Sequence, residues 1–179
     1  SKLGKKLKSL QSSPATDAGM QPGDIIRELN GQPITSVAQL IDLIKNNGDE
    51  EMTLKTERTQ KVLSRVEAEK NFLELKKGHG MSTGDPVRLT FAKPPKGLRK
   101  GAVYFARVEG DKIFLHQTAQ NANRDSKPIA FSSAGNQVRL FAQSAGNERK
   151  TLKITPHKGQ LGILPSQDLS LVFKPDKPG

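Results

Sequence analysis

The alternation of hydrophobic and polar residues near the start of the chain predicts short strands joined by tight turns. Leu7–Gln11 alternates in this way, and Ser13–Pro14 combines a capping hydroxyl with proline, which is typical of the start of a helical turn. Asp24–Leu29 predicts a second strand, and the Asn30–Gly31 pair after it is typical of a type I′ hairpin turn. We therefore expect a strand, a helical turn and a hairpin in this order.

The next segment predicts a helix of about three turns, Val37–Asn47. Ser36 and Gln39 have the spacing of a capping box, and Gly48 supplies a left-handed terminator. The apolar positions cover more than the single stripe of an ordinary surface helix. They are Val37, Leu40, Ile41, Leu43 and Ile44. Either this helix is buried on two sides, or one of its faces lines a groove.

After Asn71 the pattern changes to short alternating runs separated by Gly, Pro and Asp, which is typical of a small all-β unit. Just before it, the segment 61–69 fits a strand or a helix, and its Val and Ala spacing favours the strand. Polar residues 118–128 predict a loop. The expected strands are 86–91, 102–108, 112–117, 129–135 and 138–144, with a hairpin turn at 109–111.

Composition limits the chemistry of this 179-residue chain. It has no Trp, one Tyr and seven Phe, so the core must be aliphatic and aromatic stacking platforms are scarce. The absence of Cys excludes disulfides, thiolate metal sites and a Cys nucleophile. No run approaches the ~20 apolar residues that a membrane-spanning helix needs. The chain begins without Met, and we expect it to be a piece of a longer protein.

The net charge of +11 is unevenly spread. Residues 1–60 hold 8 Lys/Arg and 8 Asp/Glu, whereas residues 61–179 hold 21 and 10. Such an excess would attract an anionic membrane surface or nucleic acid. The cations are scattered with few aromatic residues between them, which favours a solvated basic surface and makes nucleic acid an unexpected partner.

The segment Ser13–Gly48 resembles a PDZ domain of the kind attached to bacterial membrane and periplasmic proteases. The resemblance rests on the order "SPA", "AG", "PGD", "NG" and a Ser-capped helix, continued by the strand "MTLKTER". It implies a module that binds an extended peptide beside a sheet edge and holds the peptide's terminal carboxylate on loop N–H groups. The partner would be a peptide or a protein C-terminus.

The ending "KTLKITPHKGQLGILP" is similar to that of the circularly permuted PDZ domains of site-2-type intramembrane zinc metalloproteases, in which the carboxylate loop comes last. This resemblance implies a regulatory, extracytoplasmic (periplasmic) part of a membrane-associated enzyme of the bacterial cell envelope. The parent's His-Glu-x-x-His zinc motif is absent, and His79, His116 and His157 lack ligand spacing. We therefore expect no metal and no cofactor in this chain, with zinc only in the parent.

The resemblance also implies which side chains form the site. Leu40 and Leu43 would face the core. Pro165 has no N–H to offer a ligand, so strand addition would lose one hydrogen bond, or the groove binds nothing. The residues expected to line the groove and its carboxylate loop are Val37, Ile41, Ile44, Leu161, Gly162 and Ile163.

A second resemblance covers Asn71–Ala142. Its motifs "HGMSTGDPVRLTF" and "PPKGLRKGAVYF" resemble the small β modules repeated in phage tail and other surface proteins. Such modules are spacers or adhesive units without chemistry. The resemblance therefore implies a β-rich insert whose role is structural.

Together these readings predict an α+β, mostly β fold: a circularly permuted PDZ-like small β-barrel with one long and one short helix, interrupted by an all-β insert. The expected divisions are 1–70 and 144–166 for the two PDZ-like parts, 71–143 for the insert and 167–179 for a basic, proline-containing tail.

Three functions remain open. The first is a non-catalytic regulatory module that binds apolar C-termini or extended segments, or the parent's own membrane domain, and gates substrate access during regulated intramembrane proteolysis. The second is a structural or adhesive β protein with a degenerate PDZ domain. The third is a basic domain that docks on an anionic membrane surface or nucleic acid. Intrinsic catalysis is not expected. No part of the sequence is left for a protease core once the two modules are assigned, and no segment has the motif of a phosphate loop. The acids 49–51 fit a solvated cluster.

Overall fold

The computed structural model describes residues 13–124 and 126–163, and these form two compact units. Unit 1 contains residues 13–58 and 148–163, and unit 2 contains residues 59–147. The chain therefore leaves unit 1, builds unit 2 and returns to complete unit 1. Within the part of the chain described, no helix is long and apolar enough to cross a membrane.

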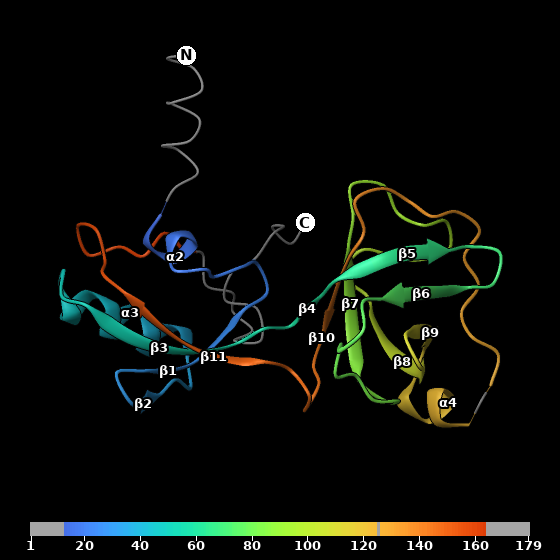
Figure 1. The fold of residues 1–179 in the computed structure, drawn as a ribbon, viewed down its shortest axis with the longest axis horizontal. Helices are drawn as coiled ribbons and strands as arrows, with labels where there is room; N and C mark the ends of the chain where they lie inside the picture. Colours follow the sequence, from blue (N-terminus) through green and yellow to red (C-terminus); the bar gives the residue numbers. More distant parts are fainter. Residues whose placement is uncertain (1–12, 125, 164–179) are drawn as a thin grey trace, which may run out of the picture. The chain divides into compact units, whose positions relative to one another are not determined.

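Unit 1 is a four-stranded antiparallel sheet with two helices (Figure 1). Its strand order is β11-β3-β1-β2, so the strand that follows unit 2 pairs with β3 along its whole length, from Arg149 opposite Glu57 to Ile154 opposite Met52. The elements are α2 (Pro14–Asp17), β1 (Ile25–Leu29), β2 (Gln32–Pro33), α3 (Val37–Asn47), β3 (Met52–Glu57) and β11 (Arg149–Ile154).

Local sequence signals explain these elements. Ser13 caps α2, with Pro14 in the first turn of the helix. Asn30 and Gly31 both have positive φ, 50° and 83°, as a type I′ turn between β1 and β2 requires. Those expectations are confirmed, as is the helix Val37–Asn47.

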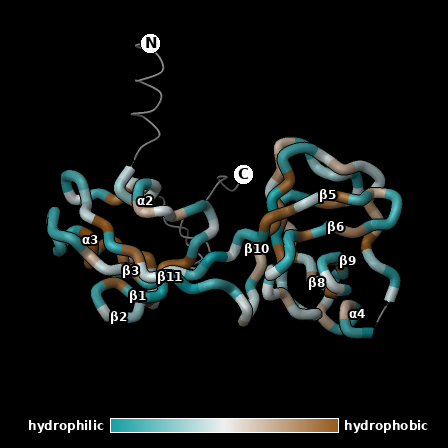
Figure 2. The backbone as a smooth tube through the Cα atoms, in the orientation of Figure 1, coloured by the Kyte–Doolittle hydropathy of each residue, from teal (hydrophilic) through white to brown (hydrophobic). Residues whose placement is uncertain are grey.

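Unit 2 is a seven-stranded antiparallel sheet in the order β4-β10-β7-β8-β9-β6-β5, with one short helix. Figure 2 shows that hydrophobic residues follow the strands of each unit while most turns are hydrophilic. The elements are β4 (Gln60–Lys61), β5 (Leu63–Glu67), β6 (Phe72–Leu75), β7 (Pro86–Thr90), β8 (Val103–Glu109), β9 (Lys112–His116), α4 (Ala119–Asn123) and β10 (Arg139–Ala142).

Each unit has its own hydrophobic core. The core of unit 1 is aliphatic and combines both helices, the sheet and the last described loop, with Ala15, Met20, Ile26, Leu29, Leu40, Ile44, Met52, Leu54, Ile154 and Leu161. The core of unit 2 adds two aromatic rings, Tyr104 and Phe131, to its aliphatic residues. The expected aliphatic core is thus confirmed for unit 1.

The α+β, mostly β fold class is confirmed, but the sheets are open rather than closed small barrels. In unit 2 the strand choice within 61–69 and the 109–111 hairpin are confirmed. Two expectations are wrong: the loop 118–128 contains α4, and residues 129–135 form no strand. The boundaries between the compact units lie at residues 58/59 and 147/148. The predicted module boundaries lie at 70/71 and 143/144, and this division into modules stays a prediction.

Three predicted features cannot be compared with the structure. The expected strand Leu7–Gln11, the proline at position 165 and the basic tail lie outside the described residues.

Candidate functional site

Helix α3 has one buried side and one accessible apolar side. Leu40 is fully buried, Ile44 is 8% exposed, and Leu43 packs against the same core from its margin. Ile41 is 39% exposed, and Val37, four residues earlier on the same face, is half-buried. The helix therefore carries more apolar surface than the core of unit 1 covers.

The cap of α3 differs slightly from the expected box. The Ser36 hydroxyl accepts from the Gln39 N–H at 3.1 Å, as a capping serine does. The Gln39 amide oxygen, however, accepts from the N–H of Thr35 at 2.7 Å, one residue before the cap. The start of the helix is fixed all the same, and with it the position of Val37.

The last described loop of unit 1, residues 157–163, returns to this helix. His157 and Gln160 exchange two backbone hydrogen bonds, of 2.9 and 3.1 Å, which close a tight turn. The Gly159 N–H donates to the Asp49 carboxylate at 2.7 Å, across 110 residues of sequence. Asp49 lies just beyond the end of α3, so this bond ties the loop to the helix.

The segment 161–163 is anchored on both sides. Leu161 is 2% exposed and belongs to the same core as Leu40 and Ile44, and Ile163 packs against that core. The Leu161 carbonyl accepts from the Ala15 N–H at 2.9 Å, which joins the loop to α2. The loop is thus held to α3 through the core and to α2 through a backbone hydrogen bond.

Gly162 is required by its surroundings. Its φ is +80°, a region that side chains disfavour, and a Cβ there would overlap Ser13. Only glycine permits this close approach to the start of α2.

Three consecutive backbone donors in this loop have no acceptor in the part of the chain that the structure describes. Within the described chain, the N–H groups of Leu161, Gly162 and Ile163 make no hydrogen bond. Gly162 is exposed, so its neighbourhood is open to solvent. Successive unpaired N–H groups in a turn form a concave site for an anion such as a carboxylate.

Five of the six expected site residues lie on two elements of unit 1, helix α3 and the loop 157–163, and they differ in exposure. Val37 is half-buried and Ile41 exposed on α3, while Leu161 is buried, Gly162 exposed and Ile163 half-buried on the loop. Ile44, the sixth, lies in the core of unit 1 together with Leu161. Their assignment to a ligand groove stays a prediction, since the segment after Ile163 lies outside the described residues.

A buried ion pair fixes the turn that precedes β1. Asp24 is fully buried, and its carboxylate accepts from the Arg58 Nε at 2.7 Å and from the Gln21 N–H at 2.9 Å. Arg58 also donates to the Gly19 carbonyl at 3.0 Å. The Asp of the "PGD" motif therefore has a structural role that the sequence pattern did not reveal: it binds Arg58, the residue that follows β3.

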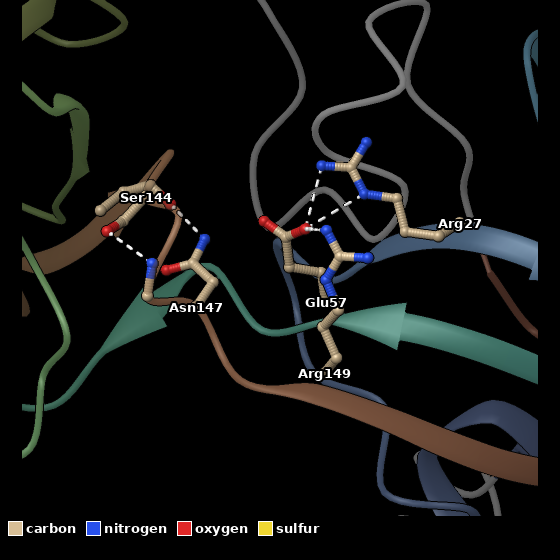
Figure 3. A network of polar contacts seen from close by, with 7 residues as sticks. Arg27, Glu57, Ser144, Asn147 and Arg149 are labelled. Carbon is tan, nitrogen blue, oxygen red and sulfur yellow. Dashed lines mark hydrogen bonds and ion pairs between the residues drawn. The ribbon is translucent and has the colours of Figure 1, made fainter.

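Figure 3 shows polar contacts of Arg27, Glu57 and Arg149 in unit 1 and of Ser144 and Asn147 in unit 2. In unit 1 the largely buried Glu57 accepts from Arg27 at 3.1 and 3.0 Å and lies 3.8 Å from Arg149. In unit 2 the Asn147 N–H donates to the Ser144 carbonyl at 3.1 Å. The first cluster links β1, β3 and β11, and the second closes the turn that ends unit 2, so both are structural.

His116 in unit 2 is a buried titratable group with a shifted pKa. It is 1% exposed, and burial, followed by the charge of Arg107, lowers the pKa of its imidazole. Its Nε2 has no hydrogen-bond partner, and its Nδ1 lies 3.4 Å from the Ser126 hydroxyl. That hydroxyl donates instead to the Asn121 carbonyl at 2.8 Å, so the pair lacks the arrangement of a nucleophile and its base. In the described ranges no three His, Cys, Asp or Glu side chains are placed to hold a metal.

Comparison with known families supports the geometry of unit 1. Residues 9–58 match the family described as PDZ domain. A comparison with curated proteins gives no match. A PDZ domain is therefore present at residues 9–58, and such domains generally bind peptide C-termini or proteins, which suggests a peptide-binding module.

Proposed function

We propose that this chain is the non-catalytic, regulatory PDZ part of an intramembrane zinc metalloprotease. In this proposal unit 1 binds apolar C-termini or extended apolar segments and gates substrate access to a membrane domain outside this sequence. The zinc belongs to that domain, and the chain lies on the extracytoplasmic side of a bacterial membrane. The resemblance of "KTLKITPHKGQLGILP" to the permuted PDZ domains of such enzymes supports the protease context.

The observation that carries the binding proposal is the row of N–H groups at Leu161, Gly162 and Ile163, which have no acceptor among the described residues. A peptide carboxylate would accept from these donors, and charge-assisted hydrogen bonds of this kind are about twice as strong as neutral ones. The exposed Ile41 and the half-buried Val37 supply accessible apolar surface on α3, whose buried side shares a core with Leu161. An aliphatic C-terminal side chain would cover that surface as its carboxylate docks.

The test is a titration of the whole chain with fluorescent peptides that end in Val, Leu or Ile. Each peptide is used with a free carboxylate and with a C-terminal amide. We expect the amide to bind at least ~10-fold more weakly, because hydrogen bonds to a charged acceptor contribute about 1.5–3 kcal/mol. Equal affinities for both forms would contradict the proposal.

A variant pair isolates the helix. Ile41→Arg removes apolar contact worth about 1.5–3 kcal/mol and places a charge in the groove, so we expect a loss of at least ~10-fold. Asn46→Arg adds the same charge to an exposed position on the opposite side of α3 and should leave affinity within about twofold. If wild type and both variants behave alike, unit 1 is a degenerate PDZ domain of a structural or adhesive protein.

A further inference from the structure

The cations of unit 2 are concentrated in two segments that contain no acid. Residues 86–108 hold six Lys/Arg and residues 126–147 hold two, and neither segment has an Asp or Glu. The strands within them, β7 and β10, pair antiparallel, with Arg139 opposite Thr90. Sequence positions about fifty residues apart are therefore brought together as one acid-free region.

Backbone contacts lock the loops beyond these strands side by side. Lys93 and Asn136 form a bridge, and the Asn136 N–H donates to the Lys93 carbonyl at 2.8 Å. Lys96 donates its N–H to the Ser133 hydroxyl at 2.8 Å, and its carbonyl accepts from Ser132 at 2.9 Å. The cations on these loops thus project from a fixed backbone.

Two glycines make this approach possible. Gly97 has a φ of +110°, and a Cβ there would lie 2.6 Å from the Ala130 carbonyl oxygen. Gly135 has a φ of +68°, and its Cβ would lie 2.6 Å from the Lys93 carbonyl oxygen. Side chains at either position would force the loops apart.

The basic loop surface consists of Lys93, Lys96, Arg99, Lys100 and Arg139, all exposed. Among the described residues none of these five forms an ion pair with a carboxylate. Two other arginines of unit 2 do form ion pairs: Arg65 pairs with Glu67 and Glu74, and Arg107 pairs with Glu109. Within the described ranges, the five charges of the basic loop surface therefore have no carboxylate partner and can meet an external anion.

We propose that the basic loop surface of unit 2 docks on an anionic membrane surface. Val103 follows these loops at the start of β8 and is 39% exposed, one of three large hydrophobic side chains exposed in the described residues. Cations beside an exposed apolar side chain suit the headgroup boundary, where charge attraction and apolar contact act together.

Nucleic acid fits the surface less well. Single-strand binding uses exposed aromatic rings, and no large aromatic side chain of the described chain is exposed. Duplex binding places a helix or ribbon in a groove, and the one helix of unit 2 in these ranges, α4, has five residues. Headgroup phosphates require only exposed cations on flexible stems.

The test is flotation of the whole chain with vesicles of phosphatidylcholine in which about a third of the lipid is phosphatidylglycerol. The variant Lys93→Gln/Lys96→Gln/Lys100→Gln removes three charges from the surface. Each Lys near an anionic surface contributes about fivefold in partitioning, so we expect a loss of about a hundredfold. Pure phosphatidylcholine vesicles should not retain the wild type.

The matched control is Lys70→Gln/Lys76→Gln/Lys77→Gln, which changes the net charge equally at exposed turns around the β5–β6 hairpin. We expect it to lose no more than about fivefold, because attraction falls off within a Debye length of about 8–10 Å. Equal losses in the two triple variants would overturn the proposal. So would tighter binding of a DNA or RNA oligonucleotide that the first variant abolishes. Peptide binding by unit 1 is measured separately, so its failure leaves this result interpretable.

Discussion

The replacement Leu161→Ala tests whether the loop after β11 belongs to the same domain as residues 13–58. Leu161 is 2% exposed and packs in one core with Leu40, Ile44 and Leu54. Removing its three buried carbons loses about 0.8 kcal/mol each, or roughly 2.4 kcal/mol of transfer free energy. A cavity adds to this, and Leu→Ala replacements in cores cost about 2–5 kcal/mol.

We expect about 3 kcal/mol, because the half-buried Ile163 beside it allows partial collapse into the cavity. Hydrogen exchange measured by mass spectrometry is the suitable assay, since it reports stability segment by segment. Amides of β1 and β3 should exchange roughly a hundredfold faster in the variant. Amides of β8 and β9, in unit 2, should keep wild-type rates.

The matched control is Leu140→Ala, which removes an equally buried Leu from the core of unit 2. It should speed exchange in β8 and β9 and leave β1 and β3 unchanged. Unchanged exchange in β3 of Leu161→Ala would refute the reasoning, because the loop would then contribute nothing to the core of unit 1.

Further predictions concern buried charge, strain and titration. Arg58→Ala leaves the Asp24 carboxylate buried without its cation and should lower the stability of unit 1 by about 3–5 kcal/mol in urea unfolding, whereas Arg58→Lys should recover part of it. Gly135→Ala and Gly110→Ala both place a side chain at positive φ, but only the first also meets backbone atoms, so Gly135→Ala should destabilise unit 2 by more than the ~1–2 kcal/mol of the second. Because the pKa of His116 is lowered in the folded chain, the unfolded chain binds a proton at this imidazole first as pH falls. The free energy of unfolding should therefore be at its full value above about pH 6.5 and decline below it, by at most ~1.4 kcal/mol per pH unit. Urea unfolding at about pH 7.5 and pH 5.5 should show this decline in wild type and a smaller one in His116→Gln, and equal declines would contradict the assignment.

Short sequence motifs predicted the turns, helix caps and helix limits of unit 1. The Asn30–Gly31 turn, the Ser13 and Ser36 caps and the limits of α3 all depend on residues within a few positions of one another. The glycine loop and its partner helix were also paired from the sequence, through the resemblance rather than through any local pattern. The structure places Leu161 in one core with α3.

The errors lie where tertiary contacts replace local preference. Residues 129–135 alternate like a strand, yet the Phe131 N–H donates to the side chain of Asn71 instead of a neighbouring strand. Phe131 is buried in the core of unit 2 all the same, which explains the apolar pattern. Helix α4 has a Thr118 cap that was visible in the sequence, but its five polar and small residues give no amphipathic period.

The unpaired donors at the site could not be predicted from sequence. Whether an N–H group is free depends on every acceptor around it, and the position of this loop depends on a distant contact, the hydrogen bond from the Ala15 N–H to the Leu161 carbonyl. The crowding of Ser13 against Gly162 is likewise a contact between distant segments.

The central claim is that the Leu161, Gly162 and Ile163 amides hold a peptide carboxylate. Amide NMR spectra of the whole chain, recorded during titration with an aliphatic C-terminal peptide, test it directly. The account predicts that these three amides and those near Ile41 shift with the free carboxylate, and that the first three do not shift with the amidated peptide. Identical shifts with both peptides, or shifts confined to unit 2, would contradict it.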